Sequence, residues 1–153
     1  MFKTHIAFAL LFGLWFFDKF NGNKILFFSL LLISAAIVDI DVTNSKIGKK
    51  FWVFSKIFNF LFKHRTLFHS LLFAVILSFV VWFFFEQIWM PVFLGYSSHI
   101  LLDSLTIEGI NFIYPFKQLR LSGFIETGKT KELILFFLII MIDMLLLFQI
   151  LYY

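Results

Sequence analysis

The amino-acid sequence predicts an all-α integral membrane protein that forms a single domain over residues 1–153. Hydrophobic residues make up 61% of the chain, phenylalanine alone occurs 26 times, and only 14% of the residues are charged. The mean hydropathy of +0.97 lies outside the range of soluble globular proteins. Five apolar stretches recur along the chain, so we expect a bundle of about five transmembrane helices.

The five apolar stretches differ in length. They cover residues 6–17, 25–38, 67–85, 88–107 and 133–151. A bilayer core about 30 Å thick requires roughly 20 apolar residues per helix, which the last three stretches provide. The first two need flanking residues at membrane depth or a locally thinner bilayer. Lys3 before the first stretch also fits a signal peptide, but no small-residue cleavage site follows it, so we expect a retained helix.

The positions of the basic residues predict the orientation in the membrane. With five crossings, 11 of the 13 lysines and arginines fall on one face, and only Lys19 and Lys24 fall on the other. Positively charged loops stay in the cytoplasm. We therefore expect a protein of the cytoplasmic (inner) membrane, with its N-terminus in the cytoplasm and its C-terminus on the outer side of that membrane. The net charge of +4 therefore reflects topology, and we expect no nucleic-acid partner.

A further helix is expected between Gly48 and Lys63. Aromatic and aliphatic residues recur there at three- and four-residue steps, and lysines recur every seven residues. The apolar positions are Phe51, Phe54, Phe58 and Leu61, and the lysines are Lys49, Lys56 and Lys63. This pattern is typical of an amphipathic helix at the cytoplasmic interface, with its lysines directed at anionic lipid headgroups. We expect this helix to anchor the protein at the membrane surface rather than to gate the entry of a substrate.

Ionisable side chains interrupt the apolar sequence at one predicted level of the bundle. Such groups are costly to desolvate and need a partner, an ion or a water-filled cavity. Seven of them are expected at the cytoplasmic ends of four helices: His5, Asp39, Asp41, His64, His69, His99 and Asp103. Helix bundles build metal centres from side chains delivered in this way. Because the chain contains no cysteine, we predict a metal site of imidazole and carboxylate ligands.

The spacing of these residues restricts how they can act together. His99 and Asp103 are four residues apart, so one face of a helix carries both and they can share an ion. His64 and His69 are five residues apart, about 140° around a helix. Both can bind an ion only if His64 lies in the loop and the third helix begins after it. We place His5 just before the first helix.

Three further residues receive expected roles. Asp39 and Asp41 would fall on opposite faces of a helix, so we expect an extended exit from the second helix, with Asp41 as the candidate general base. Arg65 is a candidate clamp for a phosphate group, because guanidinium binds phosphate oxygens bidentately. A simple positive-inside anchor is an equal alternative for Arg65. Asp143 lies away from this level and is expected to hydrogen-bond within the bundle, without a catalytic role.

Four motifs together resemble a known family. They are Thr4-His5, Val38-Asp39-Ile40-Asp41, His64-Arg65 followed by His69-Ser70, and the run from Gly95 through His99 and Asp103 to Pro115. The combination is similar to the YdjM-like family of predicted inner-membrane metal-dependent hydrolases, over roughly residues 4–116. The His99 and Asp103 pair is also distantly similar to a zinc-binding pair of zinc-dependent phospholipases C.

The resemblance implies a membrane-bound metal-dependent hydrolase. We expect one or two divalent ions as the cofactor, zinc first, with manganese and iron left open. The inner-leaflet level of the site and Arg65 predict a phosphoesterase that uses metal-activated water on a lipid or amphiphilic phosphate substrate. One alternative is a metal-free lipid phosphatase with a histidine nucleophile. The other is a non-enzymatic small carrier or ion-binding membrane protein.

Overall fold

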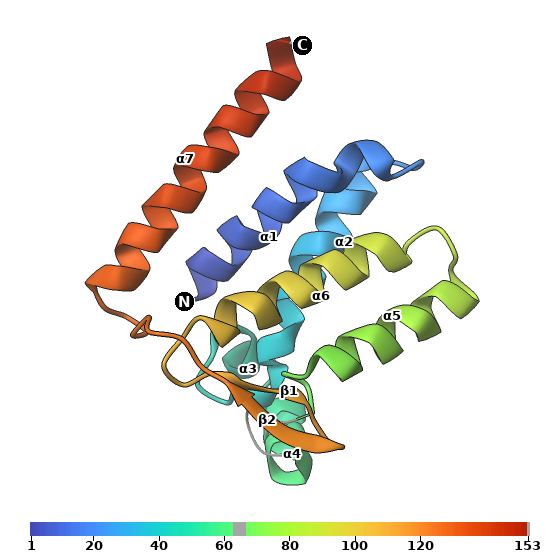
Figure 1. The fold of residues 1–153 in the computed structure, drawn as a ribbon. Helices are drawn as coiled ribbons and strands as arrows, with labels where there is room; N and C mark the ends of the chain where they lie inside the picture. Colours follow the sequence, from blue (N-terminus) through green and yellow to red (C-terminus); the bar gives the residue numbers. More distant parts are fainter. Residues whose placement is uncertain (63–66, 153) are drawn as a thin grey trace.

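The computed structural model describes residues 1–62 and 67–152, and this part of the chain is mostly helical (Figure 1). The five apolar stretches form helices α1 (Phe2–Phe16), α2 (Lys24–Ile37), α5 (Leu71–Phe84), α6 (Trp89–Ser104) and α7 (Thr130–Tyr152). The connecting elements are the 3₁₀ helices η1 (Phe17–Lys19) and η2 (Val38–Asp41), the helices α3 (Lys46–Lys50) and α4 (Trp52–Phe62), and the strands β1 (Ile110–Ile113) and β2 (Lys117–Leu121). A helix is thus confirmed at each predicted stretch.

The β1–β2 hairpin makes the all-α prediction wrong between α6 and α7. Ile110 pairs with Leu121 in an antiparallel ladder. The hairpin begins after Gly109, whose φ is +62° and where a Cβ would lie 2.2 Å from the carbonyl oxygen of Leu121, so glycine is required there. The hydroxyl of Thr106 donates to the carbonyl oxygen of Asp103 at 2.8 Å. This turn ends α6 at Ser104, earlier than the predicted residue 107.

The helices differ in whether they are long enough to cross a bilayer. Among the described residues, α7 is the helix with sufficient length and hydropathy, at 23 residues, and it is mostly exposed. Helices α1, α2, α5 and α6 have between 14 and 16 residues, or about 21–24 Å in length. Ser70 caps α5, accepting a hydrogen bond from the Phe73 N–H at 3.2 Å, so the predicted start at residue 67 is wrong. The structure therefore does not support five helices of full membrane-spanning length.

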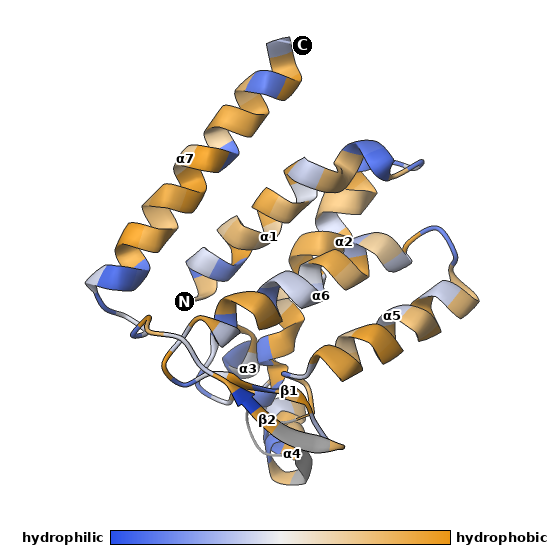
Figure 2. Cartoon of the chain, viewed as in Figure 1, coloured by the Kyte–Doolittle hydropathy of each residue, from blue (hydrophilic) through white to orange (hydrophobic). Residues whose placement is uncertain are grey.

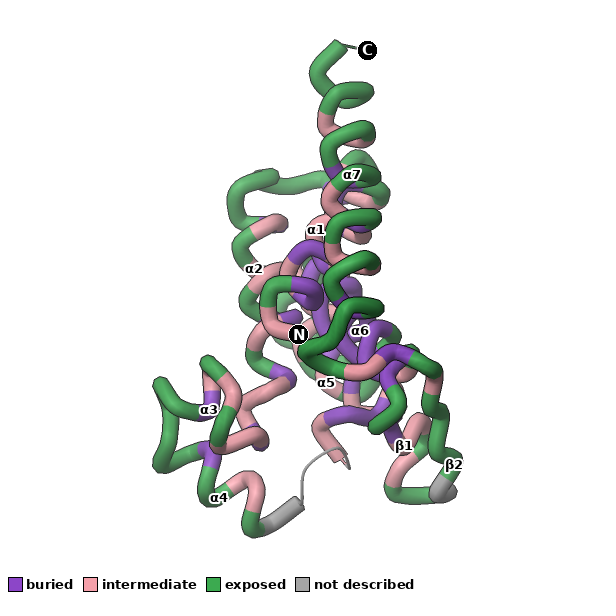
Figure 3. Tube along the Cα trace, turned by 90° about the vertical axis from the view of Figure 1, so that its left-hand side faces the viewer, coloured by how far each residue is buried: buried purple, intermediate pink, exposed green. Residues whose placement is uncertain are grey.

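The connections between the helices alternate between two ends of the bundle (Figure 1). The α1–α2 and α5–α6 connections lie at one end. The N-terminus, η2 with α3 and α4, and the hairpin lie at the other. α6 packs against α1, α2 and α5, whereas α7 packs against α1. Figure 3 shows buried residues gathered on α1 and α6, while much of α7 is exposed.

Small residues allow α2 and α6 to approach closely. A Cβ on Gly95 would lie 2.1 Å from the carbonyl oxygen of Leu31 and 2.3 Å from the hydroxyl oxygen of Ser34. Ala35, one residue further along α2, is fully buried. Packing of small residues against each other is typical of membrane helices. The contact brings the backbone near the end of α2 within reach of α6.

The helices consist mainly of apolar residues, as Figure 2 shows by hydropathy. Large hydrophobic side chains are exposed on α1, α2, α5, α6 and α7, a surface that a soluble protein rarely presents. The predicted interface helix forms as α4, preceded by α3. Its Trp52, Phe54 and Phe60 are exposed, while Ser55 is buried. The side chains of Leu61 and Lys63 lie outside what the structure describes.

Candidate metal centre

Six of the seven predicted ligands lie together at the end of the bundle that holds the N-terminus. They come from α1 (His5), η2 (Asp39 and Asp41), the turn before α5 (His69) and α6 (His99 and Asp103). His5 lies in the first turn of α1 and not before the first helix, and η2 replaces the extended exit expected at residues 39–41. The predictions for His64 and Arg65 fall outside the described residues.

Asp103 lies between three imidazole rings. Its Oδ1 is 3.1 Å from Nε2 of His5. Its Oδ2 is 3.5 Å from Nε2 of His69 and 3.6 Å from Nε2 of His99. His99 and Asp103 thus share one face of α6, as their spacing predicts. All four side chains are at most 5% exposed.

Asp39 forms the open side of the cluster. Its Oδ1 is 3.7 Å from Nε2 of His99 and 4.0 Å from Nε2 of His69. Its side chain is 23% exposed, whereas the three imidazoles and Asp103 are buried. A small molecule that enters this cluster would therefore meet Asp39 first.

The Nδ1 atoms of two histidines are held by backbone carbonyl groups. Nδ1 of His5 is 3.0 Å from the carbonyl oxygen of Met1, and Nδ1 of His99 is 2.7 Å from that of Ala35. A carbonyl oxygen only accepts, so Nδ1 carries the proton in both rings. Nε2 of each ring is then directed at Asp103, in a hydrogen bond of 3.1 Å to Oδ1 for His5 and at 3.6 Å from Oδ2 for His99. Metal-binding histidines are oriented by this type of contact.

The third histidine is oriented by a carboxylate. Nδ1 of His69 lies 3.5 Å from Oδ2 of the fully buried Asp41. Two contacts fix η2 itself. The side-chain amide of Asn59 donates to the carbonyl oxygen of Asp41 at 2.9 Å, and the hydroxyl of Ser45 donates to that of Asp39 at 2.8 Å. Asp41 therefore lies behind His69, on the opposite side of the ring from Nε2.

The distances within the cluster suit a cation better than hydrogen bonds. Four of the five Nε2–oxygen distances are between 3.5 and 4.0 Å, longer than the N–H···O hydrogen-bond range of about 2.7–3.2 Å. The fifth, from Nε2 of His5 to Oδ1 of Asp103, is a hydrogen bond of 3.1 Å. Donors that share an ion at about 2.0–2.1 Å in a tetrahedral site lie about 3.3 Å apart. Two triplets have donor atoms within 4.8 Å of one another: His5, His99 and Asp103, and Asp39, His69 and His99. These residues therefore fit a divalent ion.

Glu132 is a residue near the centre that sequence reasoning missed. Its Oε1 accepts a hydrogen bond from the Thr4 hydroxyl at 2.7 Å and lies 3.1 Å from the terminal amine of Met1. Its Oε2 accepts from the Gly128 N–H at 2.6 Å. These contacts tie α7 to the residue before His5. An acidic residue in the first turn of a helix was the available signal.

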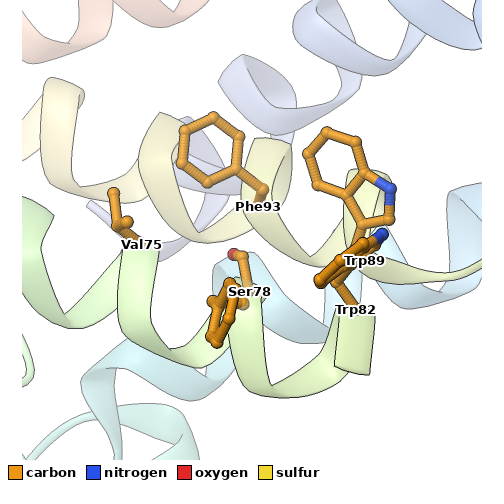
Figure 4. Close-up of a pocket in the computed structure, with 6 residues that line it drawn as sticks. Val75, Ser78, Trp82, Trp89 and Phe93 are labelled. Atoms are coloured by element: carbon orange, nitrogen blue, oxygen red, sulfur yellow. The ribbon is translucent and has the colours of Figure 1, made fainter. Parts of the chain in front are cut away.

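A separate apolar pocket lies between α5 and α6, away from the candidate centre (Figure 4). Its volume is about 400 Å³, and its walls include Val75, Trp82, Trp89 and Phe93. The hydroxyl of Ser78, which also lines it, donates to the carbonyl oxygen of Ala74 in its own helix. The pocket thus offers contacts for hydrocarbon and holds none of the predicted site residues.

Comparison with known proteins gives a family and three relatives. The family described as YdjM inner membrane protein matches residues 1–152. The chain is 38% identical over 103 residues to the uncharacterized protein YvsG of Bacillus subtilis (strain 168), covering 65% of this chain and 64% of YvsG. It is 34% identical over 91 residues to the inner membrane protein YdjM of Escherichia coli (strain K12), covering 55% of this chain and 46% of that protein, and matches YdjM of Shigella flexneri equally.

These alignments span between about half and two thirds of the length of the curated relatives. No solved structure matches the chain. The similarity to zinc-dependent phospholipases C stays a prediction.

Proposed function

The chain belongs to the YdjM inner membrane protein family, and from this premise we propose that it is a membrane-bound metal-dependent hydrolase. The resemblance based on the four motifs is confirmed by this membership. One observation carries the proposal: Nε2 of three buried imidazoles converges on the carboxylates of Asp39 and Asp103. Imidazole and carboxylate are the ligands of catalytic zinc, and manganese and iron also accept them.

Each residue of the centre has a part in this proposal. The divalent metal would be held by members of two triplets, His5 with His99 and Asp103, and Asp39 with His69 and His99. A bound divalent ion would lower the pKa of its bound water to about 7 and stabilise negative charge on a phosphoryl oxygen. Because Asp39 is the partly exposed member, substrate and water enter on its side.

Asp41 receives a different role from the one its sequence position suggested. The sequence made it a ligand and the candidate general base. Its carboxylate lies at the Nδ1 side of His69, where it orients the ring and strengthens it as a ligand. We therefore assign Asp41 as a positioning residue.

The substrate class follows from the location of the centre. The family is found in the inner membrane, and the exposed side chains of the helices are largely apolar. We propose a lipid or amphiphile that carries a phosphate group. The roles that the sequence predicts for His64 and Arg65 fall outside the described residues. With the N-terminus in the cytoplasm, the centre lies at the cytoplasmic face, and α4 rests on the lipid headgroups.

The five-helix topology is part of the same proposal. α7 crosses the membrane, and α1, α2, α5 and α6 lie within it beside α7. Helices of about 21–24 Å are accommodated by a locally thinner bilayer and by flanking residues at membrane depth. The alternation of the connections between the two ends of the bundle (Figure 1) supports this arrangement.

Metal analysis of the detergent-purified protein tests the proposal first. We expect bound zinc, manganese or iron in the wild type and none in the His99→Ala/Asp103→Ala variant. Ser104→Ala is the control on the same helix, since the Ser104 hydroxyl donates to the carbonyl oxygen of Leu101 in its own helix. A folded wild type that stays metal-free after reconstitution contradicts the proposal.

A panel of phosphate-bearing lipids tests the reaction. We expect release of phosphate or headgroup by the wild type, and loss of this release with a chelator. Release that persists in chelator would support the metal-free phosphatase. Metal-dependent flux into proteoliposomes without any hydrolysis would support the carrier.

A further inference from the structure

Asp103 divides its two oxygens between different imidazoles. Oδ1 faces His5 at 3.1 Å, while Oδ2 faces His69 at 3.5 Å and His99 at 3.6 Å. A carboxylate that chelates one ion directs both oxygens at that ion and its other ligands. A carboxylate whose oxygens face separate sets of donors can bridge two ions.

Each imidazole can serve only one ion. The Nδ1 atoms of His5 and His99 donate to the carbonyl oxygens of Met1 and Ala35, so a metal ion could bind only Nε2, which in His5 also hydrogen-bonds to Oδ1 of Asp103. The rings of His5 and His99 lie side by side, with centroids 3.8 Å apart. Their Nε2 atoms therefore reach neighbouring positions beside Asp103 from two different helices.

We propose that the centre holds two divalent cations bridged by Asp103. Nε2 of His5 and Oδ1 of Asp103 would hold one ion in place of their hydrogen bond, and Oδ2 of Asp103 with His69, His99 and Asp39 would hold the other. His99 belongs to the second position because its Nε2 is 3.6 Å from Oδ2 of Asp103 and 3.7 Å from Oδ1 of Asp39. This inference rests on the proposed metal centre and adds a second metal site to it.

The second site has a consequence for the substrate. Ionised Asp39, Asp41 and Asp103 bring three negative charges to the cluster, of which one divalent ion neutralises two. A second ion makes the sum of these charges positive, which favours an anionic substrate such as a phosphoester. Paired ions about 3.5–4 Å apart stabilise both the attacking and the leaving oxygen in phosphoryl transfer.

Metal stoichiometry and electron paramagnetic resonance of the manganese-loaded protein test the proposal without any activity assay. We expect two equivalents and a spin-coupled spectrum in the wild type, since a bridging carboxylate couples the ions. His5→Ala should retain one equivalent and show an uncoupled spectrum. Ser98→Ala is the matched control. It is a buried neighbour of His99 whose hydroxyl donates to the carbonyl oxygen of Gly95, and it should keep two coupled ions.

Three outcomes separate this inference from the proposed function. One equivalent with an uncoupled spectrum in the wild type means that Asp103 chelates a single ion, and overturns the two-ion proposal while the metal centre stands. No metal in the folded wild type overturns both. If His5→Ala does not fold, the coupled or uncoupled spectrum of the wild type alone decides.

Discussion

Asp103 and Asp143 are buried to the same extent, with each residue 2% exposed, yet their surroundings differ completely. Asp103 lies in α6, the helix that packs against three others, and faces imidazoles from three segments of the chain. Asp143 lies in α7, and neither of its carboxylate oxygens has a hydrogen-bond partner among the described residues, so the hydrogen bond expected within the bundle is not found there. A buried carboxylate is therefore not enough to identify a site. Convergence of side chains from several segments is the informative feature.

The sharpest test of this comparison is Asp103→Ala. We expect metal affinity to fall by more than the roughly 100-fold that removal of an orienting residue can cause, because both oxygens contact the ligand set. Metal titration of the purified variant measures the effect. Unchanged affinity would remove Asp103 from the centre.

Asp41→Ala tests whether a residue that orients a ligand contributes less to metal affinity than a ligand does. We expect metal affinity to fall by about 10–100-fold, because His69 loses the carboxylate at its Nδ1. The same titration applies, and Asp41→Asn should recover part of the loss, since the amide oxygen can still accept from the ring. A loss as large as that of Asp103→Ala would make Asp41 a ligand.

Thr4→Val tests the contact between α1, which carries His5, and α7, which carries Asp143. The variant removes the hydrogen bond from Thr4 to Glu132, so we expect a loss of about 1 kcal/mol in the free energy of unfolding. Metal affinity should change only a few-fold, because His5 keeps its own contacts. Thermal unfolding in detergent gives the first value, and titration gives the second. No change in unfolding would show that other contacts hold α7 against α1.

Asp143→Asn should have the smallest effect. The amide keeps the shape of the side chain, and no imidazole contact is lost, so we expect metal content and affinity to equal those of the wild type. Metal analysis beside the wild type checks this. Loss of metal would mean that α7 takes part in the centre, and would end the contrast with Asp103.

The sequence was sufficient for the part of the site that depends on helical spacing and topology. The four-residue step from His99 to Asp103 places both on one face, and alternating connections bring His5, Asp39 and His69 to the same end. These inferences need only the positions of apolar stretches, which are strong signals in this chain.

Other features depend on contacts that no pattern in the sequence specifies. α5 and α6 are shorter than their apolar stretches, because a serine cap and a hairpin turn override hydropathy at their ends. Residues 38–41 wind into a 3₁₀ helix, held by Ser45 and Asn59 from later segments. The contact between His99 and the carbonyl oxygen of Ala35 depends on the close approach at Gly95.

The distance in sequence between His5 and Asp103, 98 residues, has a consequence for biosynthesis. His5 is translated 98 residues before Asp103, its partner on α6. The set of converging side chains is therefore incomplete until α1, α2 and α6 and the turn before α5 have packed together. In the proposed centre, an ion would load only after this packing, from the side on which Asp39 is partly exposed.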